Sequence, residues 1–137
     1  MKSVYLAGPI DYDPNTGQHM DGWRHSPIWE GLPFKFYCPI CEATGKDDAA
    51  IMAGNWSALL SSAFLIAEFS SIPSFGTPIE VWAYTLQRPD RRSFIVHPGN
   101  PGLFIRELRR TGRIATGSTF QEARDWLGSM SQTFLPR

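Results

Sequence analysis

The sequence predicts an α/β fold in which helices cover both faces of a parallel sheet. Short apolar runs alternate with longer helical stretches about five times along the 137 residues, which is the order expected of β-α units. The apolar runs are continuous, as is typical of strands buried on both faces. Hydrophobic residues make up 42% of the chain and charged residues 19%, so the composition excludes a disordered, collagen-like or coiled-coil protein.

Length and composition predict one domain over residues 1–137. A chain of this size buries roughly two-thirds of its surface on folding, enough for one core. Acidic and basic residues number 13 each, and this balance argues against a dedicated nucleic-acid-binding protein. No apolar run reaches the roughly 18 residues that span a bilayer, and the N-terminus lacks the apolar core of a signal peptide. We therefore expect a cytoplasmic protein that does not enter membranes.

Five strands are predicted from apolar runs that turn residues interrupt. The first run ends in Gly8-Pro9, and Pro39 follows the second. The predicted strands are residues 3–7, 34–38, 63–67 and 93–96, with a short fifth strand at 113–116.

Helices are predicted between these strands and after the last one. Thr77 and Pro78 suit the N-cap and the first position of one helix. Pro27 interrupts another unless it kinks that helix or begins a new one. The predicted helices are residues 21–31, 48–62, 78–87, 101–111 and a last helix, capped by Ser118 or Thr119, that runs through Leu127; residues 11–20 form a polar loop. The apolar stripe of the helix at 48–62 comprises Met52, Trp56, Leu59 and Leu60.

Three loops at one edge of the predicted sheet are the expected place for a ligand. Sheets of this type bind ligands beyond the carboxyl ends of the strands, where the strand order reverses. The chain has neither a GxGxxG nor a GxxxxGK[ST] sequence, which argues against a dinucleotide or a nucleoside triphosphate. The three loops are residues 8–13, 68–76 and 97–102.

Glu80 is the carboxylate that the sequence singles out. A Ser-x-Gly-Thr turn precedes it, and the free backbone N–H groups at a helix N-terminus favour an anion. Within the first turn of that helix, the ionised form of a glutamate is stabilised. Two interpretations stay open on this pattern: a functional carboxylate, or a capping-box partner of Thr77 three residues earlier.

The segments YLAGPI, at the first strand, and SFGTPIE, at the third helix, resemble the nucleoside 2-deoxyribosyltransferase family and the similar nucleotide N-glycosidases. The longer stretch AFLIAEFSSIPSFGTPIEVWAY resembles the family's strand, loop and catalytic helix, and the resemblance covers roughly residues 3–96. It implies a flavodoxin-like or Rossmann-like doubly wound sandwich with a five-stranded parallel sheet. It also implies a retaining reaction at the C1′–N bond of a 2′-deoxynucleoside, no cofactor, and a homo-oligomer in which one subunit completes another's pocket.

The resemblance implies catalytic roles for a few residues. Glu80 would be the nucleophile, because a carboxylate stabilises an oxocarbenium-like centre and then closes on C1′. Tyr5 would hold that carboxylate by a hydrogen bond, unless it is an ordinary strand aromatic. The family's acid on the helix before the third strand is replaced by Asn55 or Trp56. Asn55 could hydrogen-bond a base, and Asp48, seven residues earlier, could supply the acid or merely cap the helix.

Residues near the loops complete the implied substrate-binding set. Trp23 could stack on a nucleobase or belong to the core, and Trp23 and Arg24 either face the pocket mouth or pack under the first loop. Asp11 and Asp13 could bind sugar hydroxyls or simply solvate the loop. The full set is Gly8, Pro9, Ile10, Asp11, Trp23, Glu68, Ser74, Gly76 and Thr77.

The substrate class remains open between related alternatives. Glu68 and Ser74 match the nucleotide hydrolases, in which the serine binds a 5′-phosphate, whereas Pro9 matches the nucleoside-acting enzymes. The leading prediction is a deoxyribosyltransferase acting on a nucleoside and a free nucleobase. The alternatives are a 5′-nucleotide N-glycosidase, a phosphoribohydrolase, and a non-catalytic nucleotide-binding or sensor module. The phosphoribohydrolase pattern has a longer glycine-rich run than SSIPSFGT, which contains one glycine.

Cys38 and Cys41 are the only cysteines, so no disulfide framework holds the fold. Their spacing is that of half a zinc site or of a redox pair. No second CxxC and no close pair of histidines follows, and we therefore expect no metal site.

Charge is distributed unevenly along the chain. Residues 1–87 carry a net charge of −5 and residues 88–137 a net charge of +5. A solvated basic face, a phosphate contact and a subunit interface are the three interpretations. Most of the excess comes from Arg88, Arg91, Arg92, Arg106, Arg109, Arg110 and Arg113.

Overall fold

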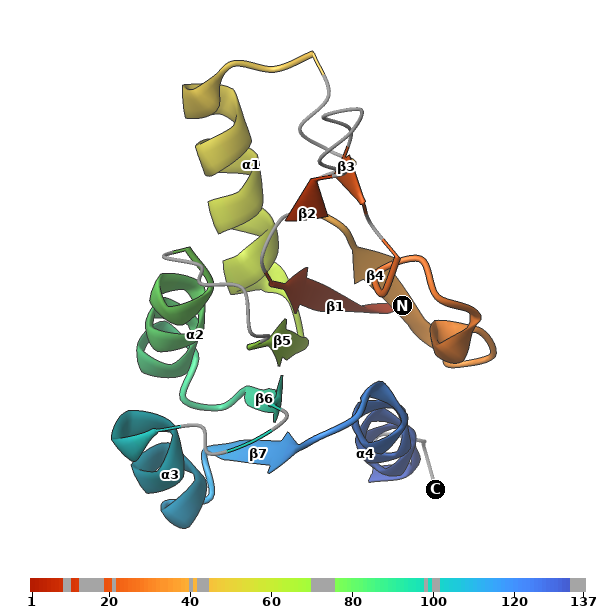
Figure 1. Ribbon diagram of the computed structural model, residues 1–137, viewed down its shortest axis with the longest axis vertical. Coiled ribbons are helices and arrows are strands. Elements are labelled where there is room, and N and C mark those ends of the chain that lie inside the picture. The colour runs from red at the N-terminus through yellow and green to blue at the C-terminus, as the bar shows by residue number, and fades with distance from the viewer. Residues whose placement is uncertain are drawn as a thin grey trace.

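A computed structural model of the chain has one five-stranded sheet with helices on both faces (Figure 1). It describes residues 1–8, 11–12, 19–20, 22–39, 41, 45–69, 76–97, 99 and 102–133. The structural statements below concern these residues.

All strands of the main sheet run parallel, which confirms the predicted α/β class. Their order is flavodoxin-like: the first strand lies inside the sheet, and the order reverses beside it. Tyr5 lies in register with Tyr37 on one neighbouring strand and with Leu65 on the other. From edge to edge the strands are β4 (Phe34–Tyr37), β1 (Lys2–Ala7), β5 (Phe64–Glu68), β6 (Arg92–Val96) and β7 (Ile114–Gly117).

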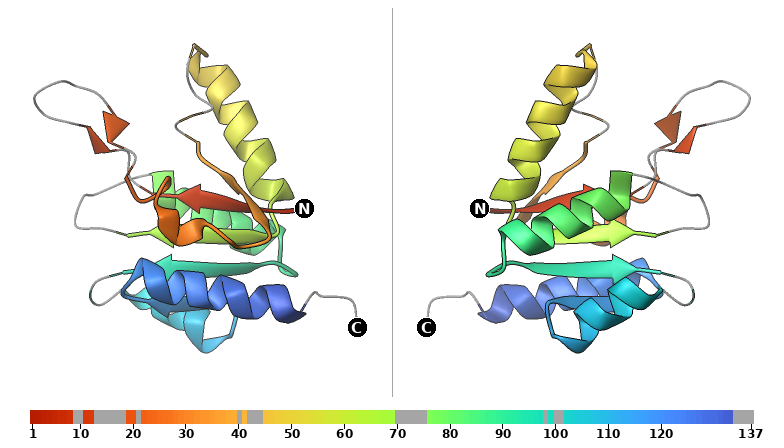
Figure 2. Two further views of the ribbon diagram at one scale, coloured as in Figure 1. Left: turned by 90° about the vertical axis from the view of Figure 1, so that its right-hand side faces the viewer. Right: turned by 90° about the vertical axis from the view of Figure 1, so that its left-hand side faces the viewer.

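Helices cover both faces of this sheet, as Figure 2 shows from two sides. One face carries α1 (Asp48–Ser61), α2 (Gly76–Gln87) and α3 (Leu103–Arg110), and the other carries α4 (Phe120–Thr133) and the short 3-10 helix η1 (Pro27–Trp29). Arg124 of α4 holds η1 in place by donating to the carbonyl oxygens of Ile28 and Glu30, at 2.5 and 2.9 Å. Within the described ranges, no helix is both long and apolar enough to cross a bilayer.

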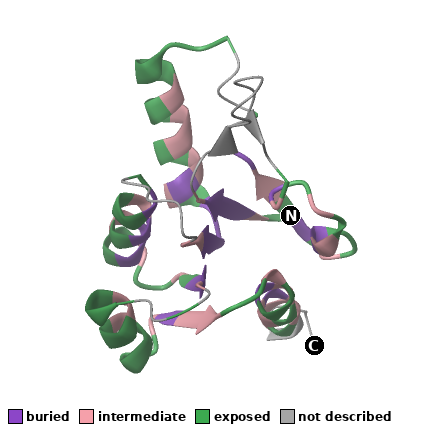
Figure 3. Cartoon of the chain, in the orientation of Figure 1, coloured by how far each residue is buried: buried purple, intermediate pink, exposed green. Residues whose placement is uncertain are grey.

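The central strands divide their side chains between two cores, one on each face, and are buried along most of their length (Figure 3). Leu6 and Ile66 belong to the core beneath α4, whereas Tyr5 and Leu65 belong to the core beneath α1 and α2. Successive strand side chains point to opposite faces, so a strand between two layers is apolar throughout. The same alternation directs Tyr5 toward α2.

Two predicted elements are wrong between β1 and β4. The helix expected at residues 21–31 is reduced to η1, since Pro27 begins a new short helix and Ser26 caps it by accepting a hydrogen bond from the N–H of Ile28. The segment expected to be a loop at residues 11–20 contains a pair of short antiparallel strands. They are β2 (Asp11–Tyr12) and β3 (His19–Met20).

The starts and faces of two helices also differ from the prediction. α2 already includes Gly76 and Thr77, so Thr77 is a buried residue of the first turn and not the N-cap. Asp47 caps α1, which leaves Asp48 as its first helical residue. The stripe on α1 is only partly buried: Leu59 is in the core, but Met52 is 74% exposed and Trp56 42% exposed. Thr119 caps α4 as predicted, by accepting from the N–H of Glu122.

Candidate active site

A hydrogen bond between Tyr5 and Glu80 forms the centre of the candidate site. Tyr5 is fully buried on β1, and its hydroxyl donates to the Oε2 atom of Glu80 in the second turn of α2. The bond joins residues 75 positions apart in the chain. It also removes the capping-box interpretation of Glu80, because the carboxylate faces the sheet and Thr77 lies inside the helix.

Burial sets the acid–base character of this pair. Desolvation raises the pKa of Glu80, while the hydrogen bond from Tyr5 and the charge of Arg24 lower it in part. Burial, followed by the nearby charge of Glu80, raises the pKa of the Tyr5 hydroxyl far above its ordinary value. Tyr5 therefore stays protonated as a donor, and Glu80 is a carboxylate held with little stabilising charge around it.

Arg24 supplies the positive charge beneath the site. Its guanidinium is buried and donates from Nε to the carbonyl oxygen of Leu6 (3.3 Å) and from Nη2 to that of Gly8 (2.8 Å). The same group lies over the ring of Trp23, 4.8 Å from the ring centroid. Arg24 therefore packs against the carboxyl end of β1 and is not among the described residues that line the pocket beside Glu80.

A pocket of about 340 Å³ opens beside Glu80, between α1 and α2. This volume lies at the small end of the range for small-molecule sites, and a mostly apolar wall with a few polar groups is typical of them. Four predicted residues line this pocket: Glu80, Asn55, Asp48 and Gly76. The remaining lining residues are Ile51, Met52, Trp56, Leu59 and Ile79.

Tyr37 is a part of the site that the sequence interpretation missed. Its ring stacks on that of Tyr5, with centroids 5.4 Å apart, and its hydroxyl donates to the Oδ1 atom of Asn55 at 3.1 Å. This bond leaves the amide nitrogen as the donor that Asn55 can offer to a ligand. The sequence alone does not indicate this role for Tyr37. It becomes apparent only from the strand register, in which Tyr5 and Tyr37 are paired on adjacent strands.

Gly8 and its neighbours lie at the carboxyl end of β1. A Cβ atom on Gly8 would be 3.0 Å from Cζ2 of Trp23 and 3.4 Å from Cβ of Glu68, so glycine allows these side chains to approach the backbone. The Trp23 ring stacks on Phe120, with centroids 5.0 Å apart, and it does not line the pocket. Of the two interpretations given for Trp23, stacking on a nucleobase or a place in the core, the structure favours the core.

Pro9, Ile10, Asp13 and Ser74 lie outside the described residues, as does the side chain of Asp11. Thr77 is 1% exposed, so its side chain belongs to the packing of α2 and does not line the pocket.

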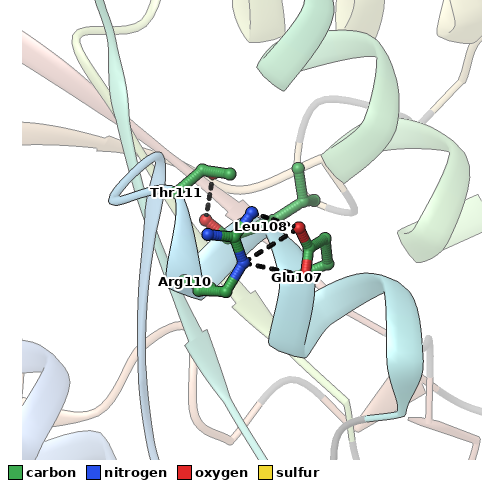
Figure 4. Close-up of polar contacts among 4 residues, drawn as sticks. All are labelled: Glu107, Leu108, Arg110 and Thr111. Atoms are coloured by element: carbon green, nitrogen blue, oxygen red, sulfur yellow. Dashed lines mark hydrogen bonds and ion pairs between the residues drawn. The ribbon is translucent and has the colours of Figure 1, made fainter.

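Part of the basic excess of the C-terminal half is engaged locally. Figure 4 shows Arg110 beside Glu107 on α3, where its Nη2 lies 2.6 Å from Oε1 and its Nε 3.0 Å from the same oxygen. Arg113 donates to the carbonyl oxygen of Thr85 at 2.5 Å. Among the described lining residues of the pocket there is no arginine, which favours the solvated-face interpretation for Arg110.

The assembled site brings together groups that nucleophilic chemistry on a small molecule would require. It combines a half-buried carboxylate fixed at one oxygen, an amide donor and a second carboxyl group around one pocket. Comparisons of the chain with protein-family models, with curated proteins and with solved structures found no match.

Proposed function

We propose that this protein cleaves or exchanges the N-glycosidic bond of 2′-deoxynucleosides through a covalent deoxyribosyl-glutamate on Glu80. The observation that carries the proposal is the Tyr5–Glu80 hydrogen bond at the wall of a pocket large enough for a small ligand. The resemblance of YLAGPI and SFGTPIE to the deoxyribosyltransferase family supports the same chemistry.

The first step would displace the base with Glu80. Tyr5 holds Oε2, so Oε1 bonds to C1′ while the C1′–N bond breaks and its electron pair leaves with the base nitrogen. The carboxylate stabilises the positive charge that develops at C1′. In the second step a nitrogen of another base attacks C1′ and gives its proton to Asp48, while the C1′–O bond of the ester breaks and its electron pair returns to Glu80. Because each displacement inverts C1′, the two together retain its configuration. Neither step changes an oxidation state, so the reaction needs no cofactor.

The departing base would be assisted from α1. Asn55 offers its amide nitrogen as a hydrogen-bond donor, because its oxygen accepts from Tyr37. Asp48 is the second carboxyl group in the pocket wall and can deliver a proton to the base nitrogen. The apolar ring of Trp56 in the same wall gives a surface on which a nucleobase can lie.

We also propose that the protein acts as a homo-oligomer. α2 and α3 present large apolar side chains to the outside: Trp82 is 49% exposed, Leu86 52% and Phe104 75%. Trp82 and Phe104 line an apolar groove of about 330 Å³ between the two helices. Large exposed apolar surfaces are typical of interaction sites, and a second copy of the chain is the proposed occupant.

Base exchange is the experiment that tests this function. The protein is incubated with a 2′-deoxynucleoside and a different free nucleobase, and products are separated by chromatography. The expected product is the exchanged deoxynucleoside. Free deoxyribose without exchange would point to a nucleoside hydrolase, and turnover of only the 5′-monophosphate to a nucleotide N-glycosidase. Binding without turnover would contradict the proposal and favour a sensor module.

The covalent intermediate can be observed separately. A 2′-fluoro-arabinosyl nucleoside slows both steps, because fluorine destabilises the positive charge at C1′. We expect intact-mass spectrometry to find one fluorinated sugar attached to the wild-type chain and none attached to Glu80→Gln. A labelled residue other than Glu80 would contradict the assignment of the nucleophile.

A further inference from the structure

Three side chains with metal-binding atoms meet beyond the carboxyl end of β4. Cys38 follows this strand directly and is buried, Cys41 comes three residues later, and His25 belongs to the turn that precedes η1. Their ligand atoms all lie within 4.8 Å of one another, and Nε2 of His25 is 3.0 Å from Sγ of Cys41. The spacing of the cysteines alone did not reveal His25, which is thirteen positions before Cys38.

We propose that His25, Cys38 and Cys41 bind a zinc ion. Zinc prefers tetrahedral sites of cysteine sulfur and histidine nitrogen, with bonds of about 2.3 and 2.0–2.1 Å. Ligand atoms around such an ion are therefore about 3.5–3.8 Å apart. The 3.0 Å contact and the 4.8 Å limit lie on either side of this separation, so small side-chain movements suffice. Three protein ligands leave the fourth position to water or to another ligand.

The composition of the cluster favours zinc over a hard cation or a disulfide. Thiolates and imidazole are soft or borderline ligands, whereas magnesium and calcium bind oxygen. A disulfide would use the two cysteines and give His25 no role. The convergence of an imidazole on a CxxC pair is instead what a Cys₂His metal site requires.

The position of the cluster separates it from the pocket beside Glu80. None of its three residues lines the pocket beside Glu80. His25 is adjacent to Arg24, which holds the carbonyl oxygens of Leu6 and Gly8. Cys38 is adjacent to Tyr37, which holds Asn55. An ion bound here would therefore connect the segment that carries Arg24 with the segment that carries Tyr37. This inference does not depend on which reaction the site performs.

Zinc binding by the full chain, reduced and stripped with a chelator, tests the proposal. We expect one zinc ion per chain by titration calorimetry and a higher Tm in its presence. Cobalt(II) in place of zinc should give thiolate-to-metal charge-transfer absorption and the intense d–d bands of a tetrahedral site. Zinc should also slow amide hydrogen exchange in residues 22–26, because His25 then anchors that turn.

Variants separate the metal site from a general effect on folding. Cys41→Ser and His25→Ala change exposed residues, and each should weaken zinc affinity more than about 100-fold, since loss of an outer-shell partner alone costs about 10–100-fold. His97→Ala is the matched control: its Nδ1 accepts from the N–H of Gly99, outside the cluster, and its zinc affinity should equal that of the wild type.

Two results would overturn the assignment. One is no zinc uptake by the reduced wild-type chain, or equal uptake by Cys41→Ser. The other is a stability gain that appears only on oxidation, with Cys38 and Cys41 joined in a disulfide and no gain from zinc in the reduced protein.

Discussion

The carboxylate of Glu80 is subject to opposing influences. Burial favours its protonated form, whereas the Tyr5 hydroxyl and the Arg24 charge favour the ionised form. A carboxylate with only partial compensation is a stronger nucleophile than one paired with a cation in direct contact. This balance makes Glu80 the residue at which the proposed chemistry is most directly tested.

Glu80→Gln should abolish turnover while the fold is retained. The amide keeps the shape of the side chain and an oxygen that accepts from Tyr5, but it cannot form the glycosyl ester. We expect a loss of at least ~10³-fold in kcat/KM, measured by base exchange, with Tm no lower than that of the wild type. Glu107→Gln on α3 is the matched control, because this exposed glutamate pairs only with Arg110 among its described contacts. An active Glu80→Gln enzyme would refute the nucleophile.

The pH dependence of activity should report the environment of Glu80. The nucleophile must be ionised, so kcat/KM should rise with pH along a limb that lies above the ordinary glutamate pKa of about 4.3. Tyr5→Phe removes the bond that lowers the pKa of Glu80, and the limb should move to higher pH. Tyr84→Phe is the control: it loses a buried hydrogen bond to the Ser62 carbonyl oxygen and should cost stability without moving the limb.

The raised pKa of Glu80 should also make the stability of the folded chain fall as pH rises. Because folding raises the pKa of Glu80, the folded chain holds this proton more tightly, and stability is lost as pH rises from the ordinary value through the raised one. Glu80→Gln cannot titrate. Its Tm relative to the wild type should therefore increase from acid to neutral pH, as followed by thermal unfolding. A constant difference across this range would contradict the raised pKa.

At the scale of elements, the sequence predicted whatever depends on local pattern. The apolar runs of β1, β5 and β6 are buried on both faces, and their positions were therefore predictable. The helix at 21–31 failed because Pro27 and long-range packing decide that segment: Trp29 lies in the core beneath α4. The Tyr5–Glu80 pair was predicted from the resemblance. The roles of Arg24 and Tyr37 depend on the strand register and on tertiary contacts, which the periodicity of the sequence does not reveal.

The start of α1 offers a pair of adjacent carboxyl groups with different roles. Oδ1 of Asp47 accepts from the N–H of Ala50 at 2.8 Å, so Asp47→Ala should lower stability by about 1 kcal/mol and leave base exchange nearly unchanged. Asp48 lines the pocket, so Asp48→Ala should reduce kcat with little change in denaturant midpoint. If both variants lose only stability, Asp48 has no part in protonating the base.

At the scale of the whole molecule, the apolar exterior of α2 and α3 predicts self-association. Sedimentation velocity should find a dimer or a larger oligomer at micromolar concentration. Trp82→Lys and Leu86→Lys place a charge on this exterior and should shift the protein toward the monomer. Gln87→Lys adds the same charge at the exposed end of α2 and should leave the oligomer intact. A monomeric wild-type protein would contradict the proposed assembly.

The position of β1 between β4 and β5 has a consequence for how the chain folds during synthesis. Its two neighbours are residues 34–37 and 64–68, so during synthesis this strand can pair on its second side only after about half of the 137-residue chain exists. No strand of the main sheet finds its partner through a tight hairpin, since parallel neighbours need a crossover. Such non-local pairing folds slowly. The apolar strand β1 therefore emerges from the ribosome long before β5, and it must stay unaggregated without its second neighbour in the meantime. The Tyr5 hydroxyl likewise waits for Glu80, its hydrogen-bond acceptor.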